Sequence, residues 1–177
     1  MNILPSWLNQ EAFWDLPIAE RALHVAAARI GEREVRRNSS PWIDRFLAAV
    51  GLNPGYAWCA SFVYWSLRAS GWDASLLPQR RKAAAVVNWR RWAAENDLIT
   101  LKPRRGDLML WVNLDNVTGH IGFITKVDGR EFETIEGNTN DAGSREGDGV
   151  YRKTRQMGGK IEFISLNKLA RLAKDHP

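Results

Sequence analysis

The sequence predicts an α+β protein in which N-terminal helices pack on a central antiparallel β-sheet. Before Pro103, apolar residues recur at helical spacing between proline and glycine residues. After Pro103, short alternating segments follow one another, separated by turns rich in glycine and aspartate. Because the helical segments come first and the strand segments afterwards, the order favours an α+β fold over the repeated βαβ pattern of a parallel sheet.

The length of 177 residues fits one domain with a substantial core. Residues 1–16 are expected to form an N-terminal arm or short helix, with Trp7 and Trp14 as anchors. Residues 17–177 are expected to form the single domain. No internal repeat or low-complexity segment suggests a further division of the chain.

The first two helices are indicated by apolar stripes between capping signals. The first has Asp15 as a candidate cap, Pro17 in its first turn and Gly31 at its end. The second covers residues 40–51, where Ser40 is the expected N-cap. The buried stripe of the second helix is expected to consist of Ile43, Phe46, Leu47 and Val50.

Two further helices and several strands complete the expected fold. A third helix, CASFVYWSLRASG, is expected over residues 59–71, and a fourth from Lys82 to Glu95. The strands are expected at residues 106–112, 120–127, 130–137, 150–156 and 160–166. A polar, glycine-rich loop over residues 139–149 is interpreted as a lid, a substrate clamp or simply a mobile connection, and a basic helical tail is expected to end the chain.

Composition restricts the class of partner. The net charge of +5 favours anionic partners, among them nucleic acid, anionic membranes and bacterial cell walls, although short basic groups usually form a solvated surface. No apolar run reaches the length of a membrane span, and the N-terminus lacks the basic segment of a signal peptide. We therefore expect the protein either to stay in the cytoplasm or to leave it by a route that needs no signal peptide.

The single cysteine, Cys59, is the first candidate for chemistry. It cannot form an internal disulfide, and it falls in the first turn of the third helix. Unpaired N–H groups and the positive end of the helix dipole favour a thiolate at that position. The alternative is a small buried residue on the helix stripe. The three histidines lie far apart in the sequence, so no metal site and no cofactor are expected.

A base and an orienting group are available in the predicted sheet. His120 opens a strand between glycines, whereas His24 is expected to be packed on a helix and His176 lies in the tail. A catalytic imidazole needs a third group that fixes its tautomer and orientation. Glu136 and Asn138, at the end of the next strand, are the candidates for that role.

The register of the hairpin decides whether the base and a carboxylate meet. A two-residue turn at residues 128–129 would place Ile121 opposite Glu136 and would turn that carboxylate away from His120. A three-residue loop, with Lys126 opposite Arg130, would place His120 opposite Glu136 and would pair apolar residues with apolar residues. We therefore favour the three-residue loop.

These motifs together resemble a known family. The segments AWCASFVYWSLRASG, PRRGDLMLWV, GHIGFITKVDG and IEGNTN resemble the CHAP amidase and peptidase domains, which belong to the papain-like and NlpC-type cysteine hydrolases. The resemblance covers roughly residues 22–155, and the motifs occur in the family's order. It implies a papain-like CHAP fold that cleaves amide bonds of peptidoglycan, as an endopeptidase or an N-acetylmuramoyl-L-alanine amidase.

The resemblance also implies roles for individual residues. Cys59 would be the nucleophile, His120 the general base, Glu136 the orienting group, and Asn138 an aid to orientation or substrate binding. The residues considered for the oxyanion hole and the substrate groove are Asn53, Tyr56, Trp58 and Gly119, although Asn53 also suits a turn and Trp58 the core. The calcium site of some CHAP enzymes is not expected, because residues 51–58 contain no acid.

Three classes of function remain open from the sequence. The leading one is a wall hydrolase with peptidoglycan as its substrate, synthesised in the cytoplasm and acting at the cell wall or periplasm after delivery by another route. It would be used as a phage-type lysin with holin machinery, or as an injected antibacterial effector with a secretion machine and a cognate immunity protein. The second is a papain-like thiol enzyme that modifies proteins as a deamidase, transglutaminase or acyltransferase. The third is a non-catalytic basic domain that binds wall polymer or nucleic acid. Such a domain would have no use for a thiol, a base and an orienting group together. We therefore do not expect nucleic acid as a partner.

Overall fold

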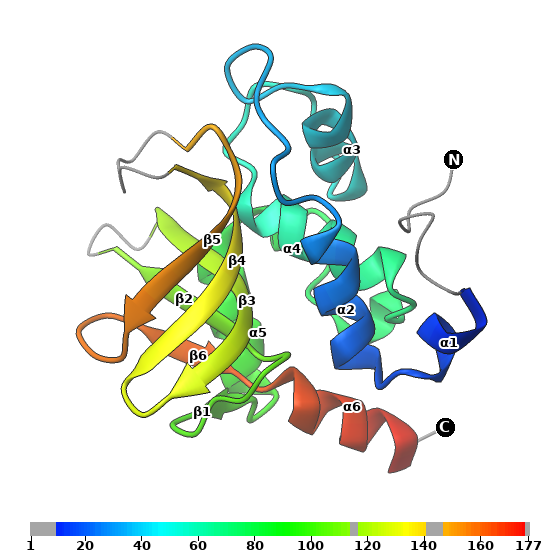
Figure 1. Ribbon diagram of the computed structural model, residues 1–177, viewed down its shortest axis with the longest axis vertical. Coiled ribbons are helices and arrows are strands. Elements are labelled where there is room, and N and C mark those ends of the chain that lie inside the picture. The colour runs from blue at the N-terminus through cyan, green and yellow to red at the C-terminus, as the bar shows by residue number, and fades with distance from the viewer. Residues whose placement is uncertain (1–9, 114–116, 141–146, 176–177) are drawn as a thin grey trace.

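A computed structural model describes residues 10–113, 117–140 and 147–175 of the chain, and it has the α+β fold that the sequence predicts. One antiparallel sheet has the strand order β1-β6-β2-β3-β4-β5, and helices cover one of its faces (Figure 1). The helices are α1 (Gln10–Asp15), α2 (Ile18–Ala27), α3 (Pro41–Ala49), α4 (Cys59–Ala69), α5 (Val86–Glu95) and α6 (Leu166–Asp175). The strands are β1 (Ile99–Thr100), β2 (Leu108–Val112), β3 (Gly119–Asp128), β4 (Glu131–Thr139), β5 (Gly149–Gln156) and β6 (Glu162–Ile164).

The helix signals of the sequence are largely confirmed. The Ser40 side chain accepts a hydrogen bond from the backbone N–H of Ile43, which caps α3 as expected, and the expected stripe of this helix is fully buried. At α2 the expectation was wrong, because Pro17 occupies the N-cap position without a side-chain cap and Asp15 belongs to α1. Trp7, the other expected anchor of the arm, lies outside the described residues.

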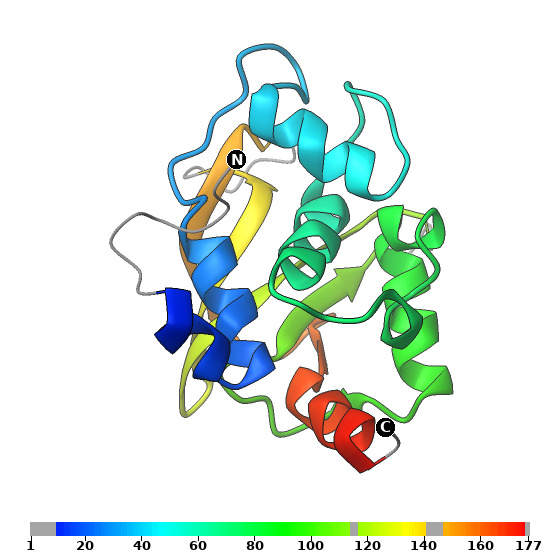
Figure 2. The ribbon, with the colours of Figure 1, turned by 90° about the vertical axis from the view of Figure 1, so that its right-hand side faces the viewer.

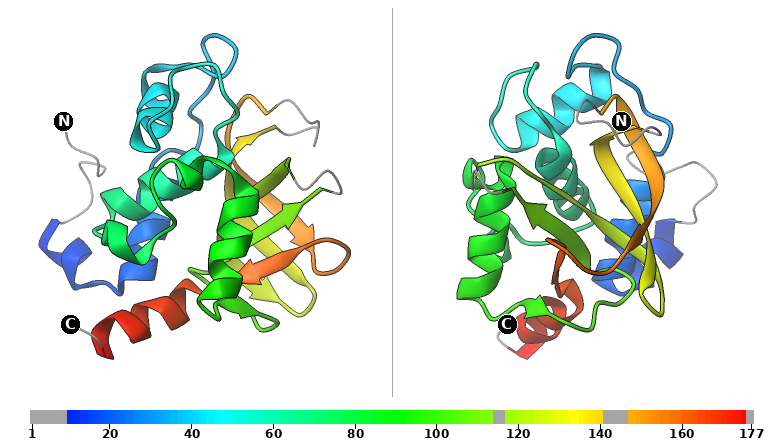
Figure 3. Two further views of the ribbon diagram at one scale, coloured as in Figure 1. Left: turned by 180° about the vertical axis from the view of Figure 1, so that it is seen from behind. Right: turned by 90° about the vertical axis from the view of Figure 1, so that its left-hand side faces the viewer.

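The fourth predicted helix is divided, and one strand was not predicted. Lys82–Ala84 forms a separate 3-10 turn, since the extended backbone of Ala85 interrupts the helix before α5 begins at Val86. The short strand β1 pairs with β6, which places it at the edge of the sheet. Figure 3 shows α5 lying alongside the sheet when the molecule is seen from behind.

The two faces of the sheet have different surroundings. On the helix side, Leu108, Leu110, Ile121 and Ile135 join the main core, which includes the buried faces of α2, α3, α4 and α5 (Figure 2). The other face carries a smaller apolar cluster of Met109, Ile124, Phe132 and Phe163. Because successive strand residues point to opposite faces, neighbours such as Ile135 and Glu136 serve different surroundings.

The observed hairpin register differs from both registers considered for the sequence. Asp128 pairs with Glu131, which leaves a two-residue turn of Gly129 and Arg130. A bulge at Thr125 then shifts the pairing, so that further along the hairpin the facing pairs are Ile124 with Thr134 and Phe123 with Ile135. The expectation that His120 lies directly opposite Glu136 was therefore wrong.

Asp107 links the start of β2 to the start of α6, and its removal is expected to destabilise the fold. This fully buried carboxylate accepts hydrogen bonds from the backbone N–H of Arg104, from the hydroxyl of Ser165 and from both the backbone and the side-chain N–H groups of Asn167. Asp107→Ala leaves these donors without their acceptor and should lower the free energy of unfolding by about 3 kcal/mol. Chemical denaturation provides the measurement.

A matched control for Asp107→Ala is Asp128→Ala. The Asp128 side chain is 76% exposed at the hairpin turn, and its ion pair with Lys126 is long at 3.5 Å. Loss of such a surface pair should change the free energy of unfolding by less than about 1 kcal/mol. Equal stability of the two variants would contradict the structural role assigned to Asp107.

Within the described residues, none of the helices combines the length and the apolar character that crossing a membrane requires.

Candidate active site

A cleft of about 490 Å³ opens where the N-terminus of α4 meets the sheet. It contains Cys59 and His120, the two residues that the sequence singled out for chemistry. The remaining lining residues are Ala57, Trp111, Asn113, Thr118, Gly119, Asn138, Thr139, Lys153 and Arg155. Segments far apart in the sequence thus supply one site, with α4 on one side and strands β2 to β5 on the other.

Cys59 is the first residue of α4, and the helix start around it has no side-chain cap. Trp58, the residue before the helix, makes no capping hydrogen bond, in contrast to Ser40 at α3. The first N–H groups of a helix have no acceptor within the helix, so those of α4 remain available to a negative charge at the cleft. The Cys59 side chain is a free thiol and is 7% exposed.

His120 connects Cys59 to the sheet. Its Nε2 lies 2.8 Å from Oε2 of Glu136, and Cys59 is a second interaction partner of the ring. Burial lowers the pKa of His120, but the hydrogen bonds to Cys59 and Glu136 and the charges of these two groups outweigh burial and raise the pKa to about 9. The ring is therefore an imidazolium, protonated on both nitrogens, at neutral pH.

Glu136 is fully buried and ionised. Burial raises its pKa, but hydrogen bonds and charge interactions with Arg155 and His120 outweigh this and lower the pKa to about 2. Arg155 binds both carboxylate oxygens, with Nε 2.5 Å from Oε1 and a terminal nitrogen 2.5 Å from Oε2. The hydroxyl of Thr134 also donates to Oε1. With these partners the carboxylate keeps one orientation toward the imidazole.

Gly122 explains how Glu136 reaches His120 in the observed register. Glu136 lies beside Gly122, and a Cβ atom at Gly122 would be only 2.6 Å from Cγ of Glu136 and 3.0 Å from the carbonyl oxygen of Ile135. Because Gly122 has no side chain, the glutamate side chain crosses over it to the imidazole two residues along β3. The pair is diagonal across the strands rather than directly opposite.

Gly122→Ala should therefore disturb the pairing of Glu136 with His120 while most of the fold persists. We expect any reaction that depends on this pair to slow by about tenfold or more, because small misplacements of reacting groups are costly. Steady-state kinetics of that reaction provides the measurement. The control is Gly129→Asn at the turn of the same hairpin, where φ is +60° and no atom lies within 4 Å of an added Cβ. Full activity of Gly122→Ala would contradict this explanation.

Arg155 was not identified from the sequence as part of the site, and it lines the cleft together with Trp111. The guanidinium of Arg155 lies 4.8 Å from the centroid of the Trp111 ring, and that ring lies 4.9 Å from the His120 ring at an interplanar angle of 38°. Trp111 and His120 face each other across β2 and β3. Arg155 thus contacts both the orienting carboxylate and the aromatic neighbour of the imidazole.

The other predicted site residues divide into two groups. Gly119 and Asn138 line the cleft, and Asn138 adopts the left-handed backbone conformation, with φ of 56°. Asn53 and Tyr56 are exposed and do not line the cleft. Trp58 is fully buried, with Nε1 donating to Glu34 at 3.0 Å, so it packs in the core instead of shaping the cleft. Much of the loop over residues 139–149 lies outside the described residues.

Metal ligands are not grouped in the part of the chain that the structure describes. No three or more His, Cys, Asp and Glu side chains there are arranged so that they could hold an ion. The arrangement of the cleft instead combines a thiol, a protonated imidazole and a buried carboxylate. These groups suit attack on a carbonyl carbon followed by proton delivery to a leaving group.

Comparison with known protein families relates this cleft to a described domain. Residues 51–138 match the family model described as the CHAP domain, and this segment contains Cys59, His120, Glu136 and Asn138. Searches of curated proteins and of solved structures found no match.

Proposed function

The chain contains a CHAP domain, a cysteine- and amidase-type hydrolase domain of a family that typically acts on peptidoglycan, and on this premise we propose that it hydrolyses amide bonds of peptidoglycan with Cys59 as the nucleophile. The observation that carries the proposal is the continuous chain of contacts from Cys59 through His120 to the buried, ionised Glu136. A domain that only bound wall polymer or nucleic acid would have no need for this arrangement.

The reaction begins with Cys59 as the thiolate and His120 as the imidazolium. The sulfur attacks the carbonyl carbon of the scissile amide, and the carbonyl oxygen takes up the negative charge. The backbone N–H of Cys59, at the uncapped start of α4, is a donor for this oxyanion. Asn138 lines the same cleft and is proposed to help position the substrate.

Collapse of the intermediate breaks the carbon–nitrogen bond. His120 gives its proton to the departing amine, and the acyl group stays on Cys59 as a thioester. His120, now neutral, takes a proton from water, whose oxygen attacks the thioester. The carbon–sulfur bond then breaks, releasing a carboxylic acid and restoring the thiolate and the imidazolium. Glu136 stabilises the positive imidazolium, and Arg155 fixes Glu136, so Arg155 is a positioning residue.

The pKa of His120 predicts a loss of activity at alkaline pH. Since the pKa is raised to about 9, the imidazolium persists below that pH and disappears as pH rises through it. We expect kcat/KM to fall with an alkaline limb centred near this value. The same raised pKa stabilises the fold below the ordinary pKa of histidine, and this contribution is lost as pH rises through about 9. If kcat/KM stayed constant from about pH 7 to about pH 10, across the His120 pKa of about 9, the role of the imidazolium would be contradicted.

The bond that is cleaved is decided by the products. An endopeptidase leaves new free amines on the wall peptides, whereas an N-acetylmuramoyl-L-alanine amidase separates intact stem peptides from the glycan. Digestion of purified Gram-negative and Gram-positive peptidoglycan, followed by mass spectrometry of the soluble products, distinguishes the two. A deamidated or cross-linked protein product with unchanged peptidoglycan would instead favour a protein-modifying thiol enzyme and overturn the proposal.

The biological setting that we propose is a phage-type lysin or an antibacterial effector delivered into a rival cell. Both use a compact wall hydrolase that reaches peptidoglycan with the help of other proteins. The effector form predicts a small protein, encoded beside this one, that binds the enzyme and blocks the cleft containing Cys59. Co-purification of that neighbour with loss of hydrolysis would support the effector form, and a neighbouring holin gene would support the lysin form.

A further inference from the structure

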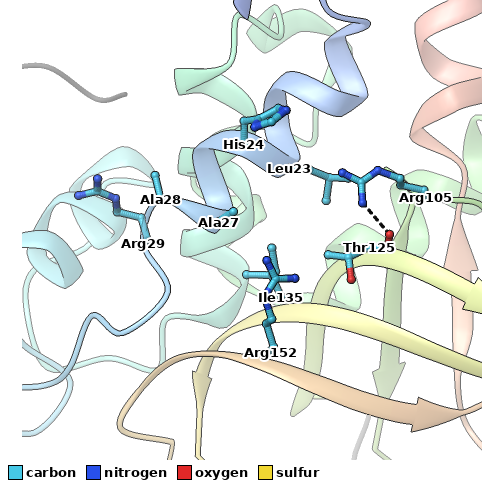
Figure 4. A pocket seen from close by; sticks show the side chains of 9 residues that line it. All are labelled: Leu23, His24, Ala27, Ala28, Arg29, Arg105, Thr125, Ile135 and Arg152. Carbon is cyan, nitrogen blue, oxygen red and sulfur yellow. Dashed lines mark hydrogen bonds between the residues drawn. The ribbon is translucent and has the colours of Figure 1, made fainter. Parts of the chain in front are cut away.

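A second cleft, of about 540 Å³, lies between α2 and strands β3 to β5 (Figure 4). Its lining and that of the active site have no described residue in common. It is on the face of the sheet that carries Ile135, whereas the active site uses Glu136 on the opposite face. Its apolar lining residues are Leu23, Ala27, Ala28 and Ile135, and its polar ones are His24, Arg29, Arg105, Thr125 and Arg152. Among the described residues that line this cleft there is no carboxylate.

Arg105 is held in place at this cleft with donors to spare. Its Nε donates to both carboxylate oxygens of Glu20, at 2.9 and 3.0 Å, and Nη1 donates to the carbonyl oxygen of Thr125 at 2.8 Å. A guanidinium has five N–H groups, so three of them remain for a ligand. Figure 4 shows the guanidinium beside Leu23, with the bond to Thr125 below it.

Arg152 brings a second guanidinium from β5. It faces Ile135 across β4 and β5, and Figure 4 shows its side chain extending past Ile135 toward α2. Within the described part of the chain, no acid forms an ion pair with Arg152. Its charge at the cleft is therefore not neutralised by a carboxylate.

Thr125 gives a second, independent sign of a ligand. The residue is 7% exposed, and its buried hydroxyl oxygen has no hydrogen-bond partner in the structure. Buried hydroxyl groups almost always have a partner. Because Thr125 lines the cleft, an acceptor bound there is a candidate partner for this hydroxyl after a change of its rotamer.

Among the described groups around the cleft, Arg152 carries the positive charge that remains. Glu20 neutralises the charge of Arg105. The guanidinium of Arg29 lies over the Trp42 ring, interacts with the charge of Glu32 and points away from the cleft in Figure 4. The backbone N–H groups of residues 28–30 donate hydrogen bonds to the carbonyl oxygens of His24, Ala26 and Ala27 at the end of α2. These carbonyls therefore already have hydrogen-bond donors.

We propose that this cleft binds a phosphate monoester with a small apolar body, with Arg105, Arg152 and Thr125 on the phosphate and the apolar residues on the body. Three donor groups from separate segments match the three terminal oxygens of a monoester, whereas one guanidinium already saturates the two oxygens of a carboxylate. The cleft is also far larger than a phosphate ion, which leaves room for an organic group over Leu23 and Ile135.

Isothermal titration calorimetry of the full chain with phenyl phosphate, inorganic phosphate and benzoate tests this ligand class at constant ionic strength. We expect saturable 1:1 binding of phenyl phosphate, about tenfold tighter than that of the other two ions. Arg152→Gln should weaken binding of phenyl phosphate by about tenfold, and Thr125→Val should weaken it several-fold. The control Arg91→Gln removes one exposed charge from α5 and should leave the affinity unchanged.

Three results would overturn the proposal. The first is that phenyl phosphate gives no saturable heat. The second is that benzoate or inorganic phosphate binds as tightly as phenyl phosphate. The third is that Arg152→Gln and the original protein bind phenyl phosphate with equal affinity. The site goes beyond the proposed hydrolase function, and Arg152→Gln should hydrolyse peptidoglycan at the original rate. Failure of the binding experiment therefore leaves the hydrolase proposal standing, and the reverse also holds.

Discussion

Replacement of Cys59 by alanine is expected to reduce the hydrolysis of peptidoglycan by at least about 10⁴-fold. Alanine removes the sulfur that attacks the carbonyl carbon, and no other thiol exists in the chain. Cys59→Ser tests the chemistry more closely, because the hydroxyl occupies almost the same space. A serine hydroxyl is far less acidic than a thiol, so this variant should be nearly as inactive.

The fold of both Cys59 variants should persist, which allows the loss to be assigned to chemistry. The side chain is small, and its neighbours on α4, such as Phe62 and Val63, remain fully buried in the core. We expect the midpoint of thermal unfolding to change by only a few degrees, as for a change of about 1 kcal/mol. Activity of either variant above one-hundredth of the original would contradict the nucleophile assignment.

Substitutions of Glu136 and of its partner Arg155 are the second set for which we expect a large effect. Glu136→Gln removes the negative charge beside the imidazolium, so the pKa of His120 should fall from about 9 toward its ordinary value and kcat/KM should fall by about 10³-fold. Arg155→Met instead leaves the fully buried carboxylate without its bidentate partner and should lower the free energy of unfolding by about 3 kcal/mol. NMR titration of His120 and chemical denaturation provide the measurements.

The double variant of Glu136→Gln and Arg155→Met separates stability from catalysis. With both charges removed, stability should recover above that of Arg155→Met, because no buried charge is left unpaired. Activity should stay as low as that of Glu136→Gln. Arg155→Lys retains a positive charge but cannot form the bidentate interaction with Glu136, so its stability should lie between those of Arg155→Met and the original protein. An active double variant would show that Glu136 does not orient His120.

Local signals in the sequence predicted the parts of the fold that depend on neighbouring residues. The cap at Ser40 and the stripe of α3 are read from spacing alone, and so is the start of α4 at Cys59. The sequence order also predicted which groups should meet, since Cys59, His120 and Glu136 lie together in the structure.

The details that the sequence could not supply depend on contacts across strands. The bulge at Thr125 changes the register, and the missing side chain of Gly122 allows a diagonal pair. Glu136 is therefore the partner of His120 that the sequence predicts, but it does not lie directly opposite. Arg155 lies 19 residues after Glu136 among other basic residues of β5, and nothing in that alternating pattern distinguishes it. Only the pairing of β4 with β5 brings the two side chains together.

The most direct test of the central claim is digestion of purified peptidoglycan by the original protein and by Cys59→Ala, with the soluble products identified by mass spectrometry. We expect new wall fragments carrying the ends of a hydrolysed amide with the original protein, and no such fragments with Cys59→Ala. Fragments of equal amount in both samples would contradict the thiol mechanism. An undigested wall in both samples, across Gram-negative and Gram-positive peptidoglycan, would contradict the wall-hydrolase function itself.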